Sequence, residues 1–160
     1  MKIHTISTAY AVYKRIEELP LEVQKLMNAA IKIKDNAYAP YSNFKVGAAL
    51  LMADGSISVG NNQENAAYPS GLCAERVAIF HASAKDPKME ILTIAIVASC
   101  ESNTVSRPVG PCGACRQVLT EYEVKQQKEI EIYFMGEIGD IIRTNSVADL
   151  LPFGFDKSYL

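Results

Sequence analysis

Hydrophobic and polar residues follow two different periods along this chain. Over Leu21–Asn36, apolar residues recur at the spacing of one helix face between Lys, Glu and Gln, after a proline suited to a helix start. The apolar run Phe44–Met52 is typical of a buried strand, and the turn Ala53–Gly55 leads into a hairpin strand over Ser56–Gly60. We therefore predict a helix followed by a β-hairpin.

Two further helices are separated by a strand. Apolar positions at helical spacing predict helices over Cys73–Lys85 and Cys112–Lys125, and the β-branched run Ile91–Ser99 predicts an interior strand between them. The remaining expected elements are two strands and a short helix, at Ile130–Met135, Ile138–Thr144 and Val147–Leu150. The order α-β-β-α-β-α-β-β-α predicts an α/β fold in which helices cover both faces of one sheet.

Composition narrows the class of protein. The chain has 160 residues, 49% of them hydrophobic, and a formal net charge of −2, which is ordinary for one globular domain. The absence of a basic run argues against nucleic acid or a membrane surface as the main partner and favours a small neutral ligand. Because the chain also lacks an apolar span and the features of a signal peptide, we expect a cytoplasmic protein.

The cysteines are too few for a disulfide-rich scaffold, so we expect thiols. Two segments, Gly71–Arg76 and Gly110–Gln117, each place a cysteine at the expected start of a helix, where the helix dipole favours thiolate. Cys112 and Cys115 lie one helical turn apart, and Cys73 would join them from the other helix. Three thiolates suit a tetrahedral zinc ion with one open position, which is the pattern of a catalytic site.

Glu75 follows Cys73 by two residues, close enough to the expected metal to act as a general base without coordinating it. A Cys-x-Glu segment followed by Pro-Cys-x-x-Cys corresponds to the signature of zinc-dependent deaminases. The combination is specific, whereas Cys-x-x-Cys alone also occurs in redox pairs and structural zinc sites.

Longer segments extend this likeness: AYAPYSNFKVGAAL, NQENAAYPSGLCAER, GPCGACRQV and DLLPFGF. Over Leu21–Phe155 the chain resembles cytidine deaminases of the small, homotetrameric, zinc-dependent type. The resemblance implies a three-layer α/β/α sandwich with a mixed five-stranded sheet. It divides the chain into an N-terminal extension of unknown role at 1–20, a catalytic domain at 21–155 and a tail at 156–160.

The resemblance also implies an activity and the residues that carry it. One zinc ion per subunit is held by Cys73, Cys112 and Cys115, while Glu75 moves protons. Cytidine and 2'-deoxycytidine are hydrolysed to uridine and 2'-deoxyuridine with release of ammonia, a step of pyrimidine salvage. Arg76 donates hydrogen bonds to the thiolates and offsets their negative charge.

The substrate side of the site follows from the same resemblance. Asn62 and Glu64 are expected to bind ribose hydroxyls, Phe44 to lie beside the base and Ala74 to offer backbone groups to the pyrimidine. Because a carboxylate repels phosphate, Glu64 favours a free nucleoside over a nucleotide.

A homotetramer is implied as well, in which neighbouring subunits complete one another's sites. Phe155 matches the aromatic residue that reaches a neighbour's site. Phe153 occupies a position where relatives often have a small residue, so either ring is a candidate for that role.

Two alternatives stay open at this point. If Cys100 were a fourth ligand, the zinc site would be closed and the protein would be a structural or binding module without catalysis. If the chain is a deaminase, its substrate is either cytidine or another aminopyrimidine nucleoside.

Overall fold

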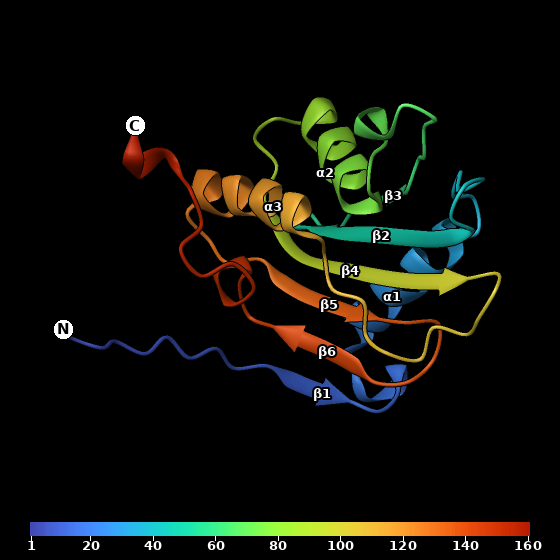
Figure 1. Ribbon diagram of the computed structural model, residues 1–160, viewed down its shortest axis with the longest axis horizontal. Helices are drawn as coiled ribbons and strands as arrows, with labels where there is room; N and C mark the ends of the chain where they lie inside the picture. Colours follow the sequence, from blue (N-terminus) through green and yellow to red (C-terminus); the bar gives the residue numbers. More distant parts are fainter.

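A mixed sheet of six strands lies between two layers of helices in the computed structural model, which describes residues 1–160 (Figure 1). The strand order is β1-β6-β5-β4-β2-β3, and among the strands only β4 and β5 pair in parallel. The strands are β1 (Ala11–Tyr13), β2 (Phe44–Met52), β3 (Ile57–Asn61), β4 (Ile91–Cys100), β5 (Glu131–Met135) and β6 (Ile141–Thr144). The predicted α/β class with helices on both faces is confirmed.

Three α-helices cover the sheet: α1 (Leu21–Lys34), α2 (Ala74–Lys85) and α3 (Gly113–Gln126). Four short 3₁₀ helices complete the fold: Ile16–Glu18 and Tyr68–Ser70 lie between longer elements, and Val147–Asp149 and Lys157–Tyr159 lie in the C-terminal segment after β6. None of the helices combines the length and apolar composition that crossing a bilayer requires.

The hydrophobic core has two halves because successive residues of a strand face opposite sides of the sheet. On one side, α2 and α3 pack over Ala48, Leu50 and neighbouring apolar residues of β4 and β5. On the other side, α1 packs over Ala49 and Leu51. Figure 1 shows α2 and α3 together on one face and α1 behind the sheet. The central strands are therefore buried on both faces, which explains their almost continuous apolar sequences.

The expected number of five strands is wrong by one, because Ala11–Tyr13, within the segment expected to be an N-terminal extension, form β1 at the edge of the sheet. β1 pairs antiparallel with β6, and the Tyr13 ring lies 6.4 Å from that of Tyr133. Next to the strand, Lys14 forms an ion pair with Asp140 at 2.9 Å. The strand covers an edge that would otherwise present unpaired backbone groups. Three residues are too few to give the alternating pattern by which a strand is recognised.

The backbone of α2 lies directly against β3 at Gly60. A Cβ atom at this glycine would be 2.4 Å from the backbone nitrogen of Ala78 and 2.7 Å from the carbonyl oxygen of Ala74. Both atoms belong to the helix that begins with the residue after Cys73. Because Gly60 has no side chain, α2 can approach β3 closely, and this contact fixes the start of α2 over the sheet.

We predict that Gly60→Ala lowers the free energy of unfolding by about 2–3 kcal/mol, since the added methyl group meets helix backbone that cannot yield locally. Urea unfolding of the metal-free protein measures this. Gly113→Ala is the matched control, because a Cβ atom there meets no atom within 4 Å. Equal stability of the two variants would contradict the close packing of α2 on β3.

Candidate active site

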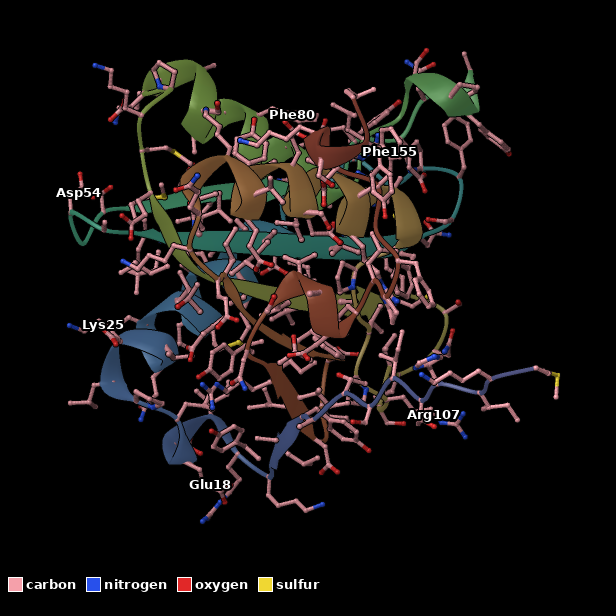
Figure 2. The ribbon with its side chains drawn as sticks, turned by 90° about the vertical axis from the view of Figure 1, so that its left-hand side faces the viewer. Glu18, Lys25, Asp54, Phe80, Arg107 and Phe155 are labelled. Atoms are coloured by element: carbon pink, nitrogen blue, oxygen red, sulfur yellow. The ribbon has the colours of Figure 1, made fainter.

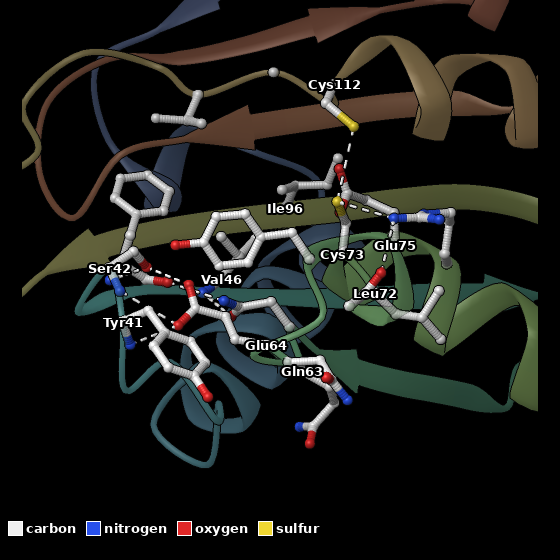
Figure 3. A pocket seen from close by; sticks show the side chains of 18 residues that line it. Tyr41, Ser42, Val46, Gln63, Glu64, Leu72, Cys73, Glu75, Ile96 and Cys112 are labelled. Atoms are coloured by element: carbon white, nitrogen blue, oxygen red, sulfur yellow. Dashed lines mark hydrogen bonds between the residues drawn. The ribbon is translucent and has the colours of Figure 1, made fainter.

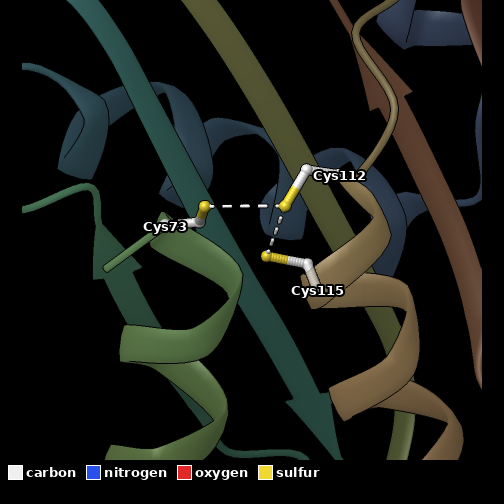
Figure 4. Close-up of side chains that lie close together, drawn as sticks. All are labelled: Cys73, Cys112 and Cys115. Atoms are coloured by element: carbon white, nitrogen blue, oxygen red, sulfur yellow. Dashed lines mark hydrogen bonds between the residues drawn. The ribbon is translucent and has the colours of Figure 1, made fainter. Parts of the chain in front are cut away.

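Three cysteine sulfurs meet where α2 and α3 begin. Cys73 is the N-cap residue of α2, Cys112 is the N-cap residue of α3, and Cys115 lies buried in the first turn of α3. The sulfur of Cys112 is 3.7 Å from that of Cys73 and 3.5 Å from that of Cys115 (Figure 4). All three sulfur atoms lie within 4.8 Å of one another. The structure thus brings together the three residues that the sequence assigned to a metal.

The spacing of these sulfurs suits a zinc ion. Tetrahedral thiolate ligands with Zn–S bonds of about 2.3 Å have sulfurs roughly 3.8 Å apart, close to the two separations above. Cys100 is not part of the cluster, and its sulfur instead lies 3.1 Å from the hydroxyl of Ser102. The closed four-cysteine site is therefore not formed. A donor set of three soft ligands leaves one tetrahedral position for a water molecule or a substrate.

Hydrogen bonds concentrate negative charge at Cys73. Its pKa is lowered to about 5, first by the neighbouring Cys115 thiol as a donor and then by the guanidinium of Arg76. The Nη2 atom of Arg76 lies 3.6 Å from the Cys73 sulfur. The pKa of Cys115 is raised, because this thiol gives its proton to the bond with Cys73 and because it is buried. The first thiolate of the cluster accordingly forms at Cys73.

Glu75 is a buried residue in the first turn of α2, with only 5% of its surface exposed. It belongs to none of the ion pairs of the structure. Burial raises its pKa above the usual value for glutamate, since the charged form loses its hydration. Figure 3 shows Glu75 beside Cys73 in the pocket wall. A buried carboxyl group with a raised pKa next to a metal cluster is a candidate for proton transfer.

A pocket with a volume of about 740 Å³ opens in front of the cysteine cluster. Its wall includes Cys73, Cys112 and Glu75 at one end and Glu64 with Tyr41 at the other (Figure 3). The other predicted residues that line it are Phe44, Asn62 and Arg76. Apolar and polar side chains share the wall, as is usual in pockets that bind small molecules.

Three of the predicted residues, Cys115, Ala74 and Phe155, do not line this pocket. Ala74, the first residue of α2, is completely buried and does not line the pocket. Phe155 lies on the outer side of the helical layer, on the same side of the molecule as Phe80 (Figure 2). The residue is 56% exposed, and its ring stacks on that of Tyr159, with ring centroids 5.4 Å apart. Phe153 is 89% exposed, and its φ of 61° is a left-handed backbone angle that favours glycine.

The side-chain amide of Asn62 ties the pocket wall to the start of β2. Its Oδ1 atom accepts a hydrogen bond from the Val46 amide at 2.7 Å, and its Nδ2 atom donates to the Phe44 carbonyl at 2.9 Å. These bonds hold the backbone on both sides of Lys45, directly after Phe44 in β2. Asn62 therefore supports the backbone of Phe44, the residue expected to lie beside the base.

Sequence reasoning missed one residue that supports the metal cluster. Arg116 follows Cys115 in α3 and donates to the carbonyl of Pro111 at 2.8 Å and to that of Leu150 at 2.7 Å. It therefore connects the loop before Cys112 with the C-terminal segment. The only signal for this role in the sequence was the position of the arginine directly after a predicted ligand.

In metal-free protein we predict that alkylation of Cys73 by iodoacetamide titrates with a midpoint near pH 5. Only the thiolate reacts, so the rate falls as pH drops through this value. Arg76→Gln removes a donor and moves the midpoint upward, whereas Arg107→Gln at an exposed position does not. Mass spectrometry of the Cys73 peptide follows the reaction. An unshifted midpoint in Arg76→Gln would disprove the role given to the guanidinium.

The chain has clear relatives among known proteins. A family model described as the cytidine and deoxycytidylate deaminase zinc-binding region matches residues 21–128. A protein named cytidine deaminase from Halalkalibacterium halodurans is 42% identical over 135 residues, which are 84% of this chain and 95% of that protein. Another from Sporosarcina psychrophila is 44% identical over 140 residues, covering 88% and 96% of the two chains.

The solved structures that are similar to this chain include cytidine deaminases as well. The crystal structure of a cytidine deaminase from Burkholderia pseudomallei has a TM-score of 0.71 and 44% identity, and covers 82% of this chain and 97% of that one. A cytidine deaminase from Mycobacterium tuberculosis has a TM-score of 0.66 at 31% identity, with 86% and 99% covered. The chain therefore belongs to the family of cytidine and deoxycytidylate deaminases, whose zinc-binding region it contains.

Proposed function

We propose that this protein is a hydrolase that converts cytidine and 2'-deoxycytidine to uridine and 2'-deoxyuridine, releasing ammonia, as a step of pyrimidine salvage. The observation that carries the proposal is the buried carboxyl group of Glu75 beside three clustered cysteine sulfurs, at the end of a pocket large enough to admit a nucleoside. Membership of the deaminase family and the names of the relatives support the same activity.

Cys73, Cys112 and Cys115 would hold one zinc ion per chain. Zinc in such a site supplies a hydroxide equivalent near neutral pH, because it makes water a stronger acid. Three thiolates carry one more negative charge than the ion neutralises, which weakens this effect. Arg76 and the N-termini of α2 and α3 place positive charge at the sulfurs and so offset the excess.

Glu75 is assigned the proton transfers. Its carboxylate takes a proton from the attacking water and gives it to the ring nitrogen of cytosine, while the water oxygen bonds to the carbon that carries the amine. Glu75 then takes the proton of the newly formed hydroxyl group and gives it to the amine; the carbon–nitrogen bond breaks, ammonia leaves, and the oxygen becomes the carbonyl oxygen of uridine. The raised pKa of the buried carboxyl group brings it closer to neutral pH, where a group both accepts and releases protons readily.

The opposite end of the pocket is assigned to the nucleoside. Phe44 packs beside the base, the backbone at Ala74 contacts the pyrimidine, and Asn62 with Glu64 binds the sugar hydroxyls. Hydrogen bonds from Ser42 and Tyr41 lower the pKa of Glu64, so its carboxylate is ionised at neutral pH. An ionised carboxylate attracts hydroxyl donors and repels phosphate, which favours nucleosides over nucleotides.

The proposal also includes a homotetramer in the cytoplasm, in which Phe155 or Phe153 completes the site of a neighbouring subunit. The exposure of both rings on the outside of the chain supports this role. We assign residues 21–155 to the catalytic unit, 1–20 to an extension and 156–160 to a tail. The contacts of β1 with β6 indicate that at least part of the extension stabilises the sheet edge.

We predict that Glu75→Gln retains about one zinc ion per chain and lowers kcat for cytidine by about 10²–10⁴-fold, because the amide cannot carry the proton. Ammonia release measures turnover, and metal analysis measures zinc. Glu121→Gln, an exposed change on α3, serves as the control and keeps full activity. Normal turnover in Glu75→Gln would rule out the assigned proton path.

A further inference from the structure

The carboxylate of Glu64 is held by the loop that precedes β2. Its Oε2 atom accepts hydrogen bonds from the backbone amides of Tyr41 at 2.9 Å and Ser42 at 3.3 Å. Its Oε1 atom accepts from the Ser42 hydroxyl at 2.5 Å. Figure 3 shows these three residues joined at the end of the pocket away from the cysteines. Three donors from two adjacent residues therefore define the position of one carboxylate.

The direction of the Ser42 hydroxyl bond is fixed by a fourth contact. The backbone amide of Phe44 donates to the Ser42 Oγ atom at 3.0 Å. A hydroxyl has a single proton. The Oγ atom accepts a hydrogen bond from the Phe44 amide, and an ionised carboxylate can only accept hydrogen bonds. The Ser42 hydroxyl therefore donates its proton to the hydrogen bond with Glu64. The lowered pKa of Glu64 agrees with a carboxylate stabilised in this way.

The hydrogen bonds already present limit what Glu64 can bind. An ionised carboxylate accepts about four hydrogen bonds, and three of them are occupied by the loop. The acceptor that remains is on Oε1, the oxygen held by Ser42. Its direction is set mainly by the Ser42 bond, since both backbone amides contact the other oxygen. Glu64 lines the pocket, so a bound molecule would meet this one acceptor.

We propose that Ser42 is a positioning residue for substrate recognition: its hydroxyl aims the free acceptor of Glu64 at a sugar hydroxyl of the nucleoside. The inference rests on the proposed function and adds a residue to it. Ser42 acts only through Glu64 and takes no part in proton transfer to the base. Its contribution should therefore depend on the sugar and be independent of the chemistry at the ring.

Steady-state kinetics of Ser42→Ala on two nucleosides tests the proposal. With cytidine we expect KM to rise about fivefold to tenfold, because a misaligned carboxylate binds the hydroxyl poorly, while kcat stays within about twofold. With 2',3'-dideoxycytidine, which lacks the ring hydroxyls, KM should be the same in wild type and variant. Ser42→Thr keeps the hydroxyl and should restore cytidine binding. Ser70→Ala, a nearby change outside the pocket lining, should alter neither substrate.

A double variant tests whether Ser42 acts through Glu64. In a Glu64→Gln background, Ser42→Ala should raise KM for cytidine little further, since the two residues act as one unit. An equal rise in KM for both nucleosides would overturn the proposal, because Ser42 would then act through its hydrogen bond with the Phe44 backbone and not through Glu64. An unchanged KM for cytidine would overturn it as well.

The proposed function can fail separately from this inference. If the wild type turned over neither nucleoside, the deaminase assignment would be contradicted. The bond from Ser42 would still be measured by carbon-13 NMR of the Glu64 carboxyl group, whose pKa should be higher in Ser42→Ala than in wild type. An unchanged pKa would show that Ser42 does not hold the carboxylate.

Discussion

The site depends on one constraint: the helices α2 and α3 begin next to each other above the sheet. α2 and α3 bring Cys73, Cys112 and Cys115 together, with all three sulfurs within 4.8 Å. Gathering thiolates in so small a volume is unfavourable unless positive charge compensates them. Both helix N-termini and the guanidinium of Arg76 supply that charge. The fold therefore prepares a cation site before any metal is bound, and the direct packing of α2 on β3 keeps it in place.

The two glutamates of the pocket differ because their surroundings differ. Glu75 is buried at the start of α2, and burial raises its pKa. Glu64 receives hydrogen bonds from the loop before β2, chiefly from Ser42, and these lower its pKa. These opposite pKa shifts in one pocket separate two tasks, since a carboxyl group with a raised pKa takes up a proton more readily, whereas a fully ionised one accepts hydrogen bonds from hydroxyls. The two ends of the pocket therefore differ in the ionisation of their glutamates as well as in position.

Long periodic segments made most of the fold predictable from sequence. The apolar run of β4 and the helical spacing of α1 each extend over ten residues or more, so local pattern and final packing agree. β1 escaped prediction because three residues carry no such pattern. The cysteine cluster could be inferred from its motif, although only the packing of α2 beside α3 sets the sulfur separations. The bond between Ser42 and Glu64 joins residues 22 positions apart through a loop, and no spacing rule indicates it.

Ammonia release from cytidine, measured on the same purified protein before and after zinc is removed and then returned, tests the catalytic role of the cysteine cluster most directly. We expect turnover to disappear on chelation and to return in proportion to bound zinc, with full activity at one ion per chain. Turnover that persisted without zinc, or a protein carrying one zinc ion per chain that released no ammonia, would contradict the assignment of this cluster as the centre of a deaminase.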